Sequence, residues 1–152
     1  MTTLIKKQIE VDAPQGVAFK VFTENMDTWW PRTHHIGSTP MTALVLETRP
    51  GGRWYTLHED GTEANVGKVL YWQPTERVVL AWQINGDFKY DPELVTEVEI
   101  VFIYKGNNKT LVEFEHRDLD RLGEGKAVES MDRGWGQILE LYKKTAGTHS
   151  VV

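Results

Sequence analysis

The chain is 152 residues long, carries a formal net charge of −5 and contains no cysteine. This length suits a single domain over residues 1–152; the charge argues against nucleic acid and anionic membranes as partners, and the missing cysteine excludes disulfides, thiol catalysis and thiolate metal sites. No segment has the apolar core of a signal peptide or the length of a membrane span, so we expect a soluble cytoplasmic protein.

The first part of the chain predicts one strand followed by two short helices. Residues 4–11 alternate weakly between apolar and polar side chains, which is typical of a strand. Asp12 is placed to cap a helix over residues 14–23, where apolar residues recur at helical spacing. A second helical piece over residues 26–30 should end before the proline that opens a loop over residues 31–40, because proline disfavours helical geometry in the residue before it.

Six further strands follow, separated by turns rich in glycine, asparagine and proline. A longer break at residues 85–93 predicts a loop. Strict alternation in the last two strands places Phe102 on one face of the first, and Phe114 with His116 on one face of the second. The predicted strands are residues 42–48, 53–58, 65–72, 77–83, 96–105 and 110–116.

The helical period returns over residues 126–145, after a polar connector. Met131, Trp135 and Ile138 lie along one apolar stripe of this helix. A six-strand antiparallel meander has one apolar face to cover, and only this helix is long enough to cover it. The predicted fold is therefore α+β with the order β-α-α-β6-α, in which a curved antiparallel sheet wraps around the long C-terminal helix and leaves a space between them.

The tryptophans are the most informative residues of the chain. Indole offers a large flat apolar face and one N–H, so it suits either a packed core or the wall of a pocket, and both interpretations stay open at this stage. Trp135 lies on the helix stripe that must face the sheet, and Trp29 and Trp30 end a helical segment beside the expected opening. The six are Trp29, Trp30, Trp54, Trp72, Trp82 and Trp135.

Several short strings occur together in a characteristic order. They are Val11-Asp12-Ala13-Pro14, Trp29-Trp30-Pro31, Gly51-Gly52-Arg53-Trp54, Gly67-Lys68-Val69-Leu70, Pro74 with Val79-Leu80-Ala81-Trp82, Thr96-Glu97-Val98-Glu99, and Gly134-Trp135. With these strings the chain resembles the family of activator-of-heat-shock-protein-90-ATPase homologues (C-terminal-domain type), within the START-like, helix-grip (SRPBCC) superfamily. The resemblance spans roughly residues 5–145, and it implies the β-α-α-β6-α fold with a cavity between sheet and long helix.

The resemblance implies a binding function more strongly than a reaction. Superfamily members bind lipids, sterols and plant hormones, and some cyclise polyketides. Because the residues offer a pocket but no recognisable catalytic array, we expect a non-catalytic protein that binds a small apolar or aromatic molecule. Two alternatives stay open: an enzyme similar to polyketide aromatase/cyclases with His116 as acid or base, and a chaperone-associated interaction module. We expect no chaperone partner, since the co-chaperone's separate N-terminal domain has no counterpart here, and a homodimer is left open.

The candidate ligand-binding residues are those expected to enclose this space. His116 is the expected main polar contact, because imidazole can donate or accept a hydrogen bond. His34 and His35 are expected in a loop at the pocket mouth. No catalytic residue, metal or cofactor is expected. The candidate ligand-binding residues are Trp29, Trp30, Trp54, Phe102, Phe114, His116, Met131, Trp135 and Ile138.

We predict that a strong chelator leaves the melting temperature unchanged, because the chain has no cysteine and no histidine pair at the spacing of metal ligands. Thermal melts with and without EDTA test this. A drop of many degrees that zinc restores would show instead that His34, His35 or His58 binds a metal.

Overall fold

The computed structural model describes residues 4–122 and 126–148. The predicted domain of residues 1–152 also includes residues 1–3, 123–125 and 149–152, which lie outside the described part. The elements in chain order are β1 (Ile5–Val11), α1 (Gln15–Thr23), α2 (Met26–Trp29), β2 (Met41–Leu46), β3 (Arg53–His58), β4 (Glu63–Gln73), β5 (Arg77–Trp82), β6 (Thr96–Gly106), β7 (Lys109–Arg117), the 3-10 helix η1 (Leu119–Leu122) and α3 (Lys126–Thr148).

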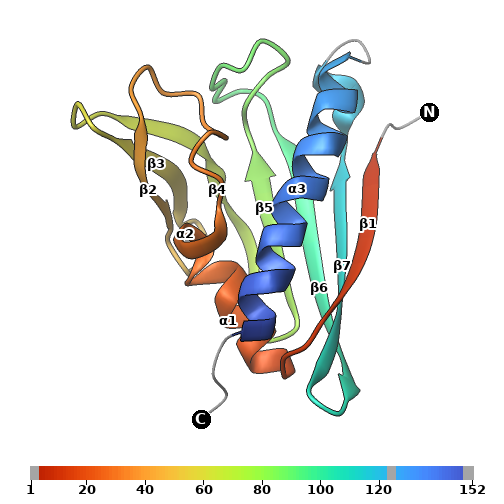
Figure 1. Ribbon diagram of the computed structural model, residues 1–152. Coiled ribbons are helices and arrows are strands. Elements are labelled where there is room, and N and C mark those ends of the chain that lie inside the picture. The colour runs from red at the N-terminus through yellow and green to blue at the C-terminus, as the bar shows by residue number, and fades with distance from the viewer. Residues whose placement is uncertain (1–3, 123–125, 149–152) are drawn as a thin grey trace.

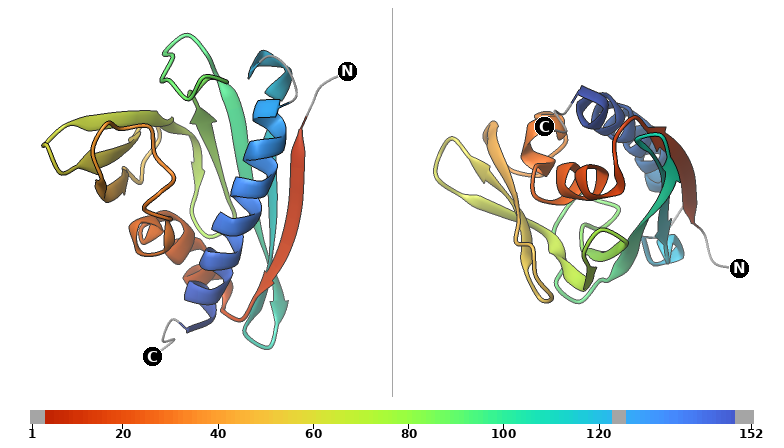
Figure 2. Two further views of the ribbon diagram at one scale, coloured as in Figure 1. Left: turned by 45° about the horizontal axis from the view of Figure 1, so that its top comes forward. Right: turned by 90° about the horizontal axis from the view of Figure 1, so that it is seen from below.

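The strands form one antiparallel sheet in the order β1-β7-β6-β5-β4-β3-β2. Strands β2 to β7 follow one another as a meander, and β1 joins the β7 edge with Ile5 opposite His116. The sheet curls around α3, which lies along its concave face, with α1 and α2 beside the C-terminal half of that helix (Figures 1 and 2). The predicted helix-grip fold is therefore confirmed. No helix in the described part of the chain is long and apolar enough to cross a membrane.

Alternation along β6 and β7 sets which side chains face α3. Ile100 and Phe102 on β6, and Phe114 and His116 on β7, are all nearly inaccessible to solvent, while their sequence neighbours are partly exposed. Successive residues of a strand point to opposite faces. The predicted inward faces of these two strands are thus confirmed, and η1, which follows β7, is an element that the sequence pattern did not indicate.

One side of helix α3 packs against the rest of the core. Trp135, Ile138 and Tyr142 recur at helical spacing and are buried. The Tyr142 hydroxyl donates a hydrogen bond of 2.8 Å to the Ala18 carbonyl of α1, so the same stripe holds both the sheet and α1. Burial raises the pKa of Tyr142, because the phenolate would lose its hydration there.

The expected cap of α1 by Asp12 is wrong. Helix α1 has Pro14 at its N-cap, with no side chain hydrogen-bonded to its first turn. The Asp12 carboxylate instead lies 2.6 Å from the Lys109 ammonium at the start of β7, and this partner lowers the pKa of Asp12. The N-cap position falls on Pro14, two residues after Asp12, so Asp12 is not at the position from which a side chain caps the first turn.

Gly67 allows two tryptophans to face each other across β4. In the strand register Gly67 lies opposite Trp54 on one side and Trp82 on the other, with a bulge beside Trp54. A Cβ atom at Gly67 would lie 1.6 Å from the Ala81 carbonyl oxygen. A backbone neighbour cannot yield as a flexible side chain can, so this close strand approach requires glycine.

We predict that Gly67→Ala destabilises the fold by about 3 kcal/mol or more, because the clash must move a backbone strand under the aromatic core. Gly16→Ala is the matched control: a Cβ there meets nothing within 4 Å, and alanine should leave stability unchanged or raise it by about 0.5–1 kcal/mol in α1. Urea unfolding of both variants measures the difference. Equal midpoints for the two variants would rule out the proposed close approach.

A pocket between the long helix and the loops

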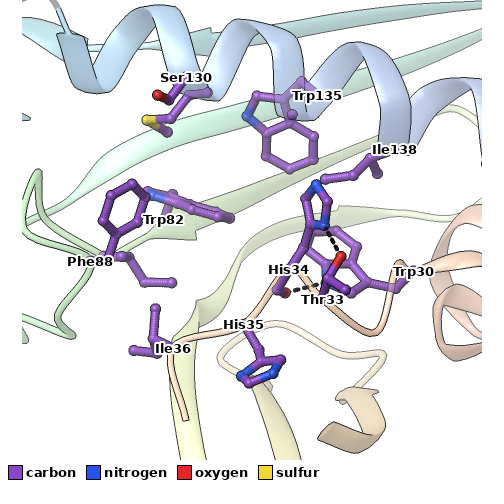
Figure 3. Close-up of a pocket in the computed structure, with 13 residues that line it drawn as sticks. Trp30, Thr33, His34, His35, Ile36, Trp82, Phe88, Ser130, Trp135 and Ile138 are labelled. Atoms are coloured by element: carbon purple, nitrogen blue, oxygen red, sulfur yellow. Dashed lines mark hydrogen bonds between the residues drawn. The ribbon is translucent and has the colours of Figure 1, made fainter. Parts of the chain in front are cut away.

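A pocket of about 250 Å³ opens where α3 passes over the end of β5 (Figure 3). One wall comes from α3, a second from Trp30 and the segment that follows it, and a third from the end of β5 and the loop beyond. The lining residues are Trp30, Thr33, His34, His35, Ile36, Trp82, Ile84, Phe88, Ser130, Met131, Gly134, Trp135 and Ile138.

The segment after α2 is fixed against the pocket by hydrogen bonds of its own. The Asp27 carboxylate accepts the Leu44 backbone N–H at 2.8 Å, which ties α2 to β2. The Trp30 indole N–H donates to the His34 carbonyl at 2.8 Å, and the His34 N–H donates to the Pro31 carbonyl at 3.0 Å. These bonds fold residues 31–34 into a turn that keeps the His34 side chain at the pocket (Figure 3).

The opposite wall is a short, ordered hairpin beyond β5. Ile84 and Tyr90 form an isolated bridge, and the Asn85 side-chain oxygen accepts the N–H groups of Asp87 and Lys89 at 2.9 and 3.1 Å. Phe88 sits at the tip with a φ of 60° and is 60% exposed. The hairpin thus holds an exposed aromatic side chain beside the pocket entrance.

Four indoles form a closed ring beneath the pocket. Ring centroids are 6.0 Å apart for Trp30 and Trp54, 5.6 Å for Trp54 and Trp82, 5.5 Å for Trp82 and Trp135, and 5.8 Å for Trp135 and Trp30. All four contacts are edge-to-face, a geometry that stabilises aromatic pairs by about 0.5–1.5 kcal/mol each beyond area burial. Three of these indoles line the pocket, whereas Trp54 is completely buried behind them.

The pocket lining has few polar groups, and most of them come from the segment after α2. Thr33 and Ser130 contribute hydroxyls, and His34 and His35 contribute imidazoles. The Nδ1 of His35 accepts the Gly37 N–H at 3.2 Å, so the proton of the neutral ring resides on Nε2. Burial, with a smaller contribution from nearby His58, lowers the pKa of His35 below its usual value near 6.5. His35 is therefore neutral at physiological pH.

His116 faces inward, as predicted, but its hydrogen bonds are all internal. An indole N–H can only donate, so Trp135 Nε1 donates to His116 Nδ1 at 3.1 Å, and the imidazole proton is on Nε2. Nε2 donates to the Thr96 hydroxyl at 2.8 Å, and that hydroxyl donates to the Trp82 carbonyl at 3.0 Å. Burial lowers the pKa of His116 to about 3. Both ring nitrogens are occupied, and the ring is not among the pocket-lining residues.

The nine candidate residues divide between the pocket and the layer behind it. Trp30, Met131, Trp135 and Ile138 line the pocket. The five others do not line it and belong to the buried core: Trp29, Trp54, Phe102, Phe114 and His116. Trp29 donates its indole N–H to the Val21 carbonyl at 2.7 Å, and Phe114 packs on Trp135 at 4.6 Å between centroids. This layer holds the lining indoles in place.

Several lining residues are absent from the sequence-based set. Trp82 gave a signal as one of the six tryptophans, but the sequence did not show the bulges in β4, the strand beside it, and so did not show which face of β5 is concave. Ile36 and Phe88 lie in loops without periodicity, so no pattern could place them. Gly134 lies where α3 approaches His34, whose ring would be 3.9 Å from an added Cβ. Its position next to Trp135 in the sequence was the one feature that could have indicated it as a lining residue.

The described part of the chain contains no group of three or more histidine or acidic side chains arranged to hold a metal. His58 has its own partners: Nδ1 donates to the Thr39 carbonyl at 2.8 Å, and Nε2 accepts the Thr56 hydroxyl at 2.7 Å. Gly37 permits this packing, because a Cβ there would lie 2.3 Å from the His58 ring.

The curled sheet, the long helix and the pocket between them define a helix-grip protein. Residues 12–147 match the family model described as "Activator of Hsp90 ATPase homolog 1-like protein". The chain therefore belongs to this family. Among curated proteins, no match to the chain is found.

Solved structures extend this comparison. The chain is similar to an anthrahydroquino-gamma-pyrone synthase, Txn09, with 31% identity over 93% of this chain and 95% of that one, at a TM-score of 0.67. It is similar to the self-sacrificing resistance protein CalC from Micromonospora echinospora, with 28% identity, coverages of 94% and 93%, and a TM-score of 0.66. Protein NE0264 from Nitrosomonas europaea, 16% identical over 94% and 93% at a TM-score of 0.67, shares the fold.

We predict that His116 makes the protein less stable as the pH falls from 7 to 5. The unfolded chain binds a proton below its ordinary pKa near 6.5, whereas the folded chain does not until the pH is near 3. The free energy of unfolding therefore falls by about 2 kcal/mol between pH 7 and pH 5 because of this one group. Urea unfolding at both pH values measures the loss.

His116→Gln should remove that pH-dependent part, because glutamine keeps a donor and an acceptor but does not titrate. His34→Gln is the matched control, since it removes a histidine that is only partly buried. If wild type and His116→Gln lose equal stability between pH 7 and pH 5, the buried neutral imidazole is not the cause.

Proposed function

We propose that this protein binds a small, flat, largely apolar molecule in the pocket between α3, the segment of residues 31–36 and the end of β5. The observation that carries the proposal is the set of three indoles, Trp30, Trp82 and Trp135, that line one opening. Aromatic walls with a few polar groups at the rim are typical of sites for small aromatic ligands.

The size and shape of the pocket support a compact ligand. Its volume of about 250 Å³ is slightly below the usual range of about 300–1,000 Å³ for small-molecule sites. The interior beneath it is filled by Trp54, Phe114 and His116, so a ligand would lie at the mouth of the helix grip. Trp29 and Phe102 support the site from farther inside the core.

The similar proteins support the same class of ligand. The name of the synthase that is 31% identical denotes a product of fused aromatic rings that include a pyrone. A flat multi-ring molecule would pack against the indoles that line the opening. We propose such a ligand for this chain without transferring the reaction, and the homodimer, the cytoplasmic location and the lack of a chaperone partner remain predictions.

A cyclase-type enzyme is the second candidate function, and the similarity to that synthase favours it. His116 is a poor acid or base for it, because burial and two internal hydrogen bonds keep it neutral. His34 and His35 contribute imidazoles to the pocket lining and would be better placed. Replacing both with glutamine should abolish turnover of a linear polyketide mimic if the protein is such an enzyme.

We predict that Gly134→Leu reduces the affinity for fluorene, a flat apolar probe, at least tenfold, because the new side chain occupies the pocket beside His34. Equilibrium dialysis measures saturable binding. The substitution should not unfold the protein, since leucine is favoured over glycine inside a helix by about 1 kcal/mol.

Gly136→Leu is the matched control. Gly136 lies on the same helix, has similar open space, and does not line the pocket. It should gain stability and bind fluorene as wild type does. Absence of saturable fluorene binding to wild type, or an equal loss in both variants, would refute the proposed site.

A further inference from the structure

We infer that the ligand of this pocket carries a hydrogen-bond acceptor, such as a ring carbonyl, that accepts the indole N–H of Trp82. This inference rests on the proposed binding function and adds to it the polar group that orients the ligand. A flat molecule with an acceptor at one edge is the class of ligand that the pocket then selects.

The indole N–H groups around the pocket differ in their partners. Trp30 donates to the His34 carbonyl, and Trp135 donates to His116. The N–H of Trp82 is shielded from solvent and has no acceptor among the described residues. A buried donor without a partner costs free energy, because it has lost its hydrogen bond to water. A bound acceptor would recover that loss.

Trp54 has the same unpaired donor but a different position. Its N–H is also buried without an acceptor in the described part of the chain, and its side chain is completely inaccessible. Trp54 does not line the pocket, whereas Trp82 does. The two indoles pack edge to face at 5.6 Å between centroids. A ligand in the pocket can therefore reach the indole of Trp82 and not that of Trp54.

Phe88 lies on the side of the pocket toward which this donor points. In Figure 3 the indole nitrogen of Trp82 points toward the Phe88 side of the pocket. The backbone around Phe88 is held by the Asn85 side chain, but the ring is 60% exposed. Exposed side chains change rotamer on a picosecond to nanosecond timescale. Rotation of this ring would open that side of the pocket to a ligand without any change in the hairpin backbone.

The required group on the ligand is an acceptor because the indole N–H can only donate. The other polar groups of the lining are the hydroxyls of Thr33 and Ser130 and the imidazoles of His34 and His35. Nδ1 of His34 is paired with the Thr33 hydroxyl at 3.0 Å and Nδ1 of His35 with the Gly37 N–H, while Nε2 of His35 carries a proton and is a second possible donor. Among the lining residues, Trp82 alone has a side-chain donor that is shielded from solvent and has no acceptor in the described part of the chain.

The test compares 9-fluorenone with fluorene, two rigid tricyclic molecules that differ by one carbonyl in place of a methylene. Wild-type protein should bind fluorenone about five- to tenfold more tightly, the gain expected for one hydrogen bond to a shielded donor. Trp82→Phe keeps an aromatic wall and removes the N–H, so it should bind the two probes equally. Trp54→Phe is the matched control and should keep the preference of wild type.

The outcomes separate the two proposals. If wild type binds neither probe saturably, the proposed function fails and this inference fails with it. If wild type binds both probes with equal affinity, the pocket is a binding site but the inferred acceptor contact is wrong. A preference for fluorenone that persists in Trp82→Phe, or that disappears equally in Trp54→Phe, also overturns the assignment to Trp82.

Discussion

The hydrogen bond from Trp135 to His116 is the contact on which the arrangement of helix and sheet depends. It joins the middle of α3 to β7, and the bonds that continue from His116 through Thr96 reach the backbone of Trp82 on β5. Two walls of the pocket are thereby connected through one neutral imidazole. A buried polar chain of this kind is favourable because every donor finds an acceptor; with one member missing it would be a liability.

The aromatic residues act both as core and as pocket wall. Trp29 and Trp54 are core residues, while Trp30, Trp82 and Trp135 each have one face in the packed interior and another at the opening. Indole and phenyl rings in edge-to-face and tilted contacts fill the interior between the sheet and α3. The pocket is consequently small and lies near the loops, where a few hydroxyl and imidazole groups are available.

Much of the fold could be predicted from the sequence, because the period of the apolar residues changes where the structure changes. Val98, Ile100 and Phe102 alternate strictly, and this alternation alone fixed the inward face of β6. The pocket could be predicted less completely. Trp135 was placed by its helix stripe. The concave face at Trp82 was hidden by bulges in the neighbouring strand β4, and the positions of Ile36 and Phe88 depend on loops without periodicity.

The sequence also could not show that both ring nitrogens of His116 are hydrogen-bonded within the protein. Its inward face follows from alternation in β7, yet its role depends on Thr96 and Trp135, which approach it from β6 and α3. Alternation gives the face of a residue and says nothing of which polar groups meet it there. A histidine on an apolar face was therefore compatible with a ligand contact and with an internal hydrogen-bond relay.

The pairing of β1 with β7 has a consequence for synthesis of the chain. Ile5 leaves the ribosome early, but its partner His116 is translated only after the whole meander. At ordinary elongation rates of about 5–20 residues per second, β1 waits roughly 5–20 s before β7 exists. The hairpins of β2 to β7 can close one after another during this time, since neighbouring strands cost little loop entropy. The first strand of the sequence is thus among the last to join the sheet. Until then its backbone N–H and C=O groups are unpaired, and they must not pair with another strand.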